Sequence, residues 1–72
     1  MLLKVKVTYN LYEFRTKAGL TTKQLAALSG VSKSMINYAE NNVKNLSVET
    51  LCKLAVALDV KPELLYNYKA YS

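Results

Sequence analysis

The apolar residues of the chain recur mostly at the spacing of an α-helix. In several stretches apolar side chains lie three, four or seven positions apart, and turn or capping residues separate these stretches. The pattern predicts helices over about residues 9–18, 22–29, 33–41 and 48–58, and a fifth helix that begins near Pro62. The apolar side of this fifth helix would hold Leu64, Leu65 and Tyr68.

Capping residues support these boundaries. Thr21 and Gln24 have the spacing of a capping box, in which each side chain binds the backbone N–H of the other residue. Ser32 and Ser47 are suitable N-caps for the two helices that follow them. Gly30 permits a sharp turn after the second helix, because glycine adopts positive φ without steric cost.

The first residues have a different pattern. Leu3, Val5, Val7 and Tyr9 alternate with polar residues, which is typical of a β-strand. A single strand has no partner in an otherwise helical chain, so two interpretations remain open. The strand could pair with its copy in a second subunit, or the segment could form a flexible arm. The predicted fold class is therefore all-α, a compact five-helix bundle with an extended N-terminal arm.

Composition and charge exclude several classes of protein. The 72 residues carry a formal net charge of +5, no histidine and one cysteine, Cys52. An internal disulfide, the usual zinc sites and catalytic triads that use histidine cannot be built from this set, so we expect no enzyme, no metal and no cofactor. The longest apolar run, Leu54–Leu58, is too short to cross a bilayer, and no signal peptide is visible. We expect no membrane contact and a reducing cytoplasmic location.

The second and third predicted helices are separated by only about three residues. Two helices joined this closely must cross steeply, which requires a small residue at the crossing, a turn without steric hindrance and an apolar anchor on the second helix. Ala26, Gly30 and Ile36 supply these features at the spacing of a DNA-binding helix-turn-helix.

The surrounding sequence resembles the lambda repressor and Cro family. The resemblance rests on RTKAGLTTKQLAALSGVSKSMINYAEN and LSVETLCKLAVALDVKPELLY, and it covers about Leu11 to Tyr68. It implies a lambda repressor-like bundle of five helices, with residues 1–8 as the arm and residues 9–72 as the helix-turn-helix DNA-binding domain. The chain departs from the family pattern at Thr22, Asn42 and Leu46, where relatives often have Gln, Gly and Pro.

The resemblance and the residue chemistry together suggest a set of DNA contacts. The resemblance implies base contacts near Lys33, Ser34 and Tyr38, and amide chemistry adds Asn37, since asparagine can pair bidentately with adenine. The candidate phosphate contacts are Thr22, Lys23, Asn42, Lys44 and Asn45.

Several of these residues also have a structural interpretation. Lys33 and Asn37 could be solvated, and Tyr38 could cover the edge of the core. The resemblance further implies an internal ion pair between Arg15 and Glu40. If that pair forms, Lys17, Lys23, Lys33 and Lys44 belong to a region without an exposed acid.

The sequence therefore predicts a bacterial or phage transcriptional regulator, acting as a repressor, that binds double-stranded DNA as a homodimer. Two alternatives remain open. One is an antitoxin-like module with a protein partner, for which the tyrosine-rich C-terminal end and the N-terminal arm would be the partner surface. The other is a non-specific nucleic-acid packer, which the positive net charge permits.

Overall fold

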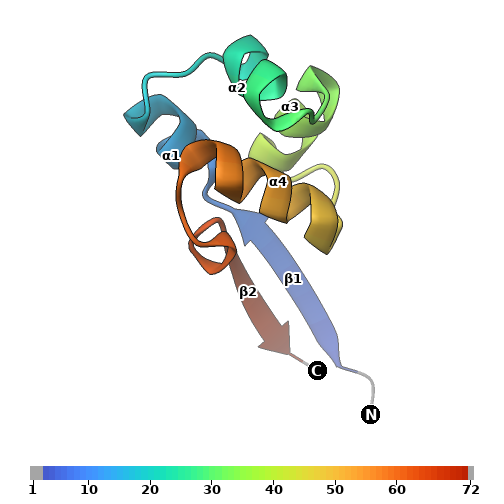
Figure 1. The fold of residues 1–72 in the computed structure, drawn as a ribbon. Coiled ribbons are helices and arrows are strands. Elements are labelled where there is room, and N and C mark those ends of the chain that lie inside the picture. Colours follow the sequence, from blue (N-terminus) through green and yellow to red (C-terminus); the bar gives the residue numbers. More distant parts are fainter. Residues whose placement is uncertain (1–2, 72) are drawn as a thin grey trace.

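The computed structural model describes residues 3–71 of the chain (Figure 1). Its elements are a strand, four α-helices, a short 3₁₀ turn and a second strand. In chain order they are β1 (Lys4–Tyr9), α1 (Leu11–Lys17), α2 (Thr22–Ser29), α3 (Lys33–Glu40), α4 (Val48–Leu58), η1 (Pro62–Leu64) and β2 (Tyr66–Tyr71).

The helix boundaries follow from the caps. α2 and α4 begin and end at the predicted residues, α3 ends one residue earlier, and α1 is shorter than predicted at both ends. The Thr21–Gln24 capping box is present, with both reciprocal hydrogen bonds formed at 3.1 and 2.8 Å. Ser32 Oγ accepts from Met35 N, and Ser47 Oγ accepts from Thr50 N. Satisfied N–H groups at their first turns fix where these helices begin.

The prediction of an all-α, five-helix bundle was wrong. Only three residues, Pro62–Leu64, form a 3₁₀ turn in place of the fifth helix, and Tyr66–Tyr71 form a strand. Leu65 is fully buried at the end of the turn. From there the chain alternates between the two faces of a sheet, and its tyrosines have high β-propensity. The backbone groups of this segment pair with β1 rather than within a helix.

The N-terminal segment is paired within its own chain. β1 and β2 form a two-stranded antiparallel sheet, hereafter the ribbon, with Val7 opposite Tyr68 and Tyr9 opposite Tyr66. The strand prediction for this segment was correct, but both interpretations of its partner were wrong for residues 4–9. Residues 1, 2 and 72 of the predicted arm and domain lie outside the described part of the chain.

The core lies between the four helices and the base of the ribbon. Among residues 3–71, eight apolar residues are buried, and they come from every helix, from the turn between α2 and α3 and from the segment after η1: Leu11, Leu25, Val31, Ile36, Ala39, Leu54, Ala55 and Leu65. Figure 1 shows the ribbon extending away from this helical body, and Lys4 pairs with Tyr71 at its far end. The long dimension of the chain, 43 Å against 21 and 19 Å, reflects this extension.

Candidate nucleic-acid interface

The turn between α2 and α3 is held by local hydrogen bonds. Gly30 has φ 75° and donates its N–H to the carbonyl of Ala26 at 2.9 Å. Ser29 Oγ accepts from Val31 N at 3.1 Å, and Val31 itself is buried in the core. Because Leu25 and Ile36 are both fully buried where the two helices pack, the orientation of α3 on α2 is fixed by the core.

The first turn of α3 is open to solvent. Lys33 and Ser34 are exposed, Asn37 is half-buried, and Tyr38 is 40% exposed one turn further along. The opposite face of the helix carries the buried Ile36 and Ala39. The four candidate base contacts therefore lie on the part of α3 that the core leaves uncovered, although Asn37 is less accessible than Lys33 and Ser34.

Tyr38 and Lys44 lie together, which the sequence did not indicate. The Lys44 ammonium is 4.9 Å from the centre of the Tyr38 ring, within the range of a cation–π contact. The Tyr38 carbonyl also accepts from Val43 N at 2.8 Å. The charge of Lys44 is thereby held beside the exposed surface of α3.

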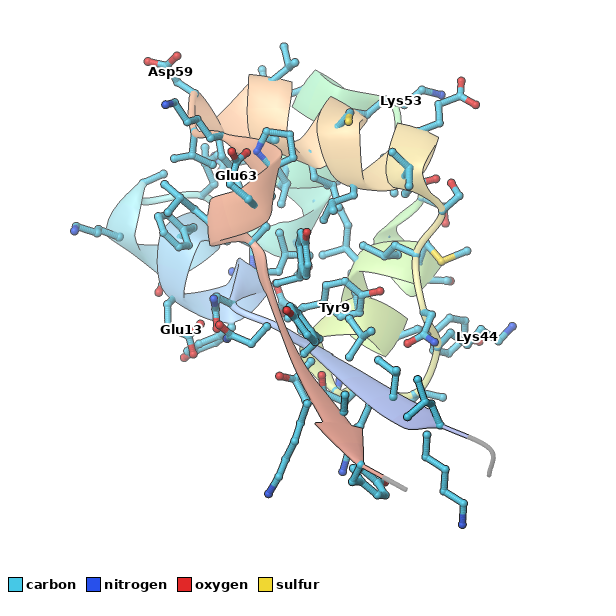
Figure 2. All side chains as sticks on the ribbon, turned by 90° about the horizontal axis from the view of Figure 1, so that it is seen from below. Tyr9, Glu13, Lys44, Lys53, Asp59 and Glu63 are labelled. Atoms are coloured by element: carbon cyan, nitrogen blue, oxygen red, sulfur yellow. The ribbon has the colours of Figure 1, made fainter. Side chains whose placement is uncertain are left out.

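The loop after α3 is anchored by Tyr9 of β1. The Tyr9 hydroxyl accepts from Leu46 N at 2.7 Å, and Tyr9 N donates to Asn42 Oδ1 at 3.3 Å. Figure 2 shows the Tyr9 ring directed toward this part of the chain. Asn42 has φ 57°, a left-handed conformation that asparagine tolerates. Its Oδ1 accepts from Tyr9 N, which orients the side-chain amide, and its Nδ2 can donate to a phosphate.

The remaining phosphate candidates occupy two sites. Thr22, half-buried, and Lys23, exposed, form the first turn of α2, where free backbone N–H groups attract anions. Lys44 and Asn45 are exposed in the loop after α3. Thus the sequence-predicted contacts lie on α2, on α3 and in the loop that follows α3.

The ion pair between Arg15 and Glu40 is present. Arg15 Nε donates to Glu40 Oε2 at 2.6 Å, Nη2 donates to Oε1 at 3.0 Å, and Nη1 donates to the carbonyl of Leu20 at 2.9 Å. The two side chains are only 12% and 9% exposed. The hydrogen bond to Glu40 raises the pKa of Arg15; burial opposes this shift and the charge of Glu40 adds to it. The only acidic residue of α2 and α3 is thus neutralised inside the fold.

The other acids lie elsewhere on the molecule. In Figure 2 the labelled carboxylates of Glu13, Asp59 and Glu63 lie on the side opposite Lys44. Glu49 is on α4, where its carboxylate lies 3.8 Å from the ammonium of Lys53. Because α2, α3 and the loop after α3 carry Lys23, Lys33 and Lys44 with no exposed acid, this surface is suited to a polyanion.

A family model described as HTH_3: Helix-turn-helix matches residues 11–65, which include all four α-helices. The chain belongs to the HTH_3 family. Membership indicates a DNA-binding protein of the transcription-regulator type rather than an enzyme. In the sequence the same relationship appeared as a resemblance to lambda repressor and Cro.

Solved structures of similar proteins agree with the HTH_3 assignment. The restriction-modification controller protein C.AhdI from Aeromonas hydrophila is 41% identical with a TM-score of 0.72, over 75% of this chain and 82% of that chain. An HTH_3 family transcriptional regulator from Vibrio cholerae is 31% identical with a TM-score of 0.71, over 75% of this chain and 30% of that chain. A protein from Bacteroides fragilis that is described as DNA-binding is 26% identical with a TM-score of 0.76, over 85% of this chain and 98% of that chain. No curated protein matches the chain.

Two negative findings concern the described residues 3–71. None of the helices in this range is long and apolar enough to cross a membrane. No group of three or more His, Cys, Asp or Glu side chains in the same range could hold a metal ion.

Proposed function

We propose that this HTH_3 protein is a sequence-specific, double-stranded DNA-binding repressor that acts as a homodimer with α3 in the major groove. The observation that carries the proposal is the exposed first turn of α3 on a fixed α2–α3 unit without an exposed acid. A helix that reads base edges needs such a free first turn and a rigid support. The 41% identity to a controller protein of a restriction-modification system supports regulation as the outcome of binding.

Within this proposal Lys33 and Ser34 make the principal base contacts. A lysine can donate to guanine O6 or N7, and a serine hydroxyl can pair with several bases. Tyr38, one turn along α3, packs on a thymine methyl or reaches a phosphate. Asn37 contributes less, because it is half-buried.

Phosphate contacts fix the register of the protein on the duplex. The first turn of α2 supplies Thr22 and Lys23, and the loop after α3 supplies Asn42, Lys44 and Asn45. Three to four phosphates neutralised by each subunit would give a dimer a slope of about −5 to −7 in a plot of log affinity against log salt concentration.

In vitro selection from randomised duplex DNA tests this function. The purified full chain is used at about 150 mM salt, where non-specific binding is weak. We expect enrichment of a two-fold symmetric site with half-sites about 34 Å apart, the distance between successive major grooves on one side of the duplex. Failure to enrich any sequence, while binding to random DNA persists, would contradict sequence-specific regulation.

A further inference from the structure

The two faces of the ribbon differ in chemistry. Directly opposed residues of an antiparallel pair share a face. One face, the apolar ribbon face, consists of Val5 opposite Ala70, Val7 opposite Tyr68 and Tyr9 opposite Tyr66, and the alternation extends it to Leu3. The other face pairs Lys6 with Lys69 and Lys4 with Tyr71, so it is cationic.

The helical body covers only the base of the apolar ribbon face. Val7, Tyr9 and Tyr66 are half-buried there. Farther out, Leu3 is 77% exposed, Val5 58% and Tyr68 70%. Figure 1 shows why, since this part of the ribbon extends beyond the helices. A two-stranded ribbon is marginally stable alone in water and needs packing on an apolar face.

A groove continues the apolar ribbon face into the body. Its volume is about 620 Å³, and it lies between the ribbon base and the start of α4. Val7, Tyr9 and Tyr66 line it from the ribbon, and Val48 and Leu51 line it from α4. Val48 is 77% exposed, so an accessible apolar side chain lies at the α4 side of the groove.

We propose that a second copy of this chain docks on the apolar ribbon face, with the tip of each ribbon in the groove of its partner. The proposal rests on the proposed function in one respect, since that function includes a homodimer, and it identifies the surface through which the two copies bind. A two-fold dimer needs a patch that is complementary to itself. The ribbon tip supplies a projecting apolar surface, and the ribbon base with α4 supplies an apolar groove on the same face, so each copy carries both parts of the patch.

Charge favours the same arrangement. The apolar ribbon face carries no charged residue, whereas burial of the opposite face would remove Lys4, Lys6 and Lys69 from water. Glu63 is the single charged residue that lines the groove. Lys4 lies on the opposite face, so it stays in water when the apolar ribbon face is covered.

The exposed area is sufficient for the centre of an interface. A specific interface covers about 800 Å² on each partner. Tyr68, at 70% exposure, and the exposed parts of Leu3, Val5 and Val48 offer on the order of 200–400 Å² of apolar surface together. The remaining area would come from the groove lining and the polar ribbon edges, as in an apolar centre with a polar rim.

Sedimentation equilibrium of the full chain without DNA, from about 1 to 200 µM, tests the proposal. We expect a dimer whose dissociation constant rises at least about 100-fold in Val5→Lys and in Tyr68→Lys, since each places a charge in both copies of the interface. Val5→Ile should keep the dimer. Val56→Lys is the matched control, because Val56 is 81% exposed on α4 and does not line the groove.

A monomer at 200 µM would overturn the proposal. So would a dimer whose dissociation constant is unchanged in Val5→Lys and Tyr68→Lys, whatever the effect of Val56→Lys. Circular dichroism of each variant checks that the helices are retained. This experiment contains no DNA, so it tests the dimer surface alone. DNA binding is tested separately by the in vitro selection, and either result can fail without the other.

Discussion

Removal of Glu40 should destabilise the domain far more than removal of an exposed acid. Its carboxylate accepts two hydrogen bonds from Arg15, and both side chains are about nine-tenths buried. Glu40→Ala leaves the Arg15 guanidinium nearly buried and without a counter-charge, which costs about 3–5 kcal/mol. A domain of 72 residues has an unfolding free energy of only about 4–11 kcal/mol. We therefore expect the thermal midpoint to fall by about 15–30 °C.

Thermal unfolding followed by circular dichroism at 222 nm measures this effect. The matched control is Glu49→Ala, since Glu49 pairs with Lys53 at 3.8 Å while 81% exposed, and its loss should cost about 0.3–0.5 kcal/mol. The double variant with Arg15→Met and Glu40→Leu should recover most of the loss, because it leaves no unpaired charge. A loss for Glu40→Ala no larger than the loss for Glu49→Ala would refute the reasoning.

The stabilisation by this ion pair should not vary with pH over the neutral range. The hydrogen bond to Glu40 raises the pKa of Arg15, so the guanidinium contribution is complete below the ordinary pKa of arginine. It would be lost only as the pH rises through the raised value. Comparison of Glu40→Ala with the unchanged chain near neutral pH therefore reports the full cost of leaving the Arg15 guanidinium without its partner.

Two further substitutions test how α3 and the loop after α3 are held in place. Tyr9→Phe leaves Leu46 N without its hydrogen-bond partner, so it should lower the free energy of unfolding in urea by about 1–2 kcal/mol. Tyr71→Phe, at the far end of the ribbon, is the control and should lower it by less than about 0.5 kcal/mol. Equal losses for the two variants would mean that the Tyr9 hydroxyl makes no specific contribution to stability. Gly30→Ala should lower the free energy of unfolding by about 1–2 kcal/mol in the same measurement, because Gly30 has φ 75°. An added Cβ meets nothing within 4 Å, so this loss comes from the backbone conformation alone, and Gly30→Asn should lose less. No loss for the alanine variant would show that the turn relaxes.

The helices were predictable because their signals are local. The cap of α2 and the turn after it lie within ten residues of each other, and the structure has them as predicted. The ribbon was not predictable in this way. Leu64, Leu65 and Tyr68 fit a helical spacing, and Tyr66–Tyr71 also fit a strand. The pairing with β1 decides between helix and strand for this segment, and it joins residues 57 or more positions apart.

The candidate site was predictable only in part. The pairing of Arg15 with Glu40 followed from the resemblance, and the structure contains it. The role of Tyr9 in the loop after α3 was missed, because the hydrogen bond from Leu46 spans 37 positions. No local pattern marks such a contact. The position of Tyr9 as the last apolar residue of the alternating segment was the only available signal, and it indicated a strand rather than a loop anchor.

The most direct test of the central claim compares Lys33→Ala with the unchanged chain on the selected site and on random duplex DNA. Fluorescence anisotropy at about 150 mM salt gives both affinities, and Lys61→Ala, an exposed lysine outside α2 and α3, is the control. If α3 reads bases, Lys33→Ala should weaken specific binding by about 1–3 kcal/mol and change binding to random DNA little, with an unchanged thermal midpoint. Equal losses on the two DNAs would show that Lys33 contacts only phosphate, and no loss on either would contradict DNA recognition by this face of α3.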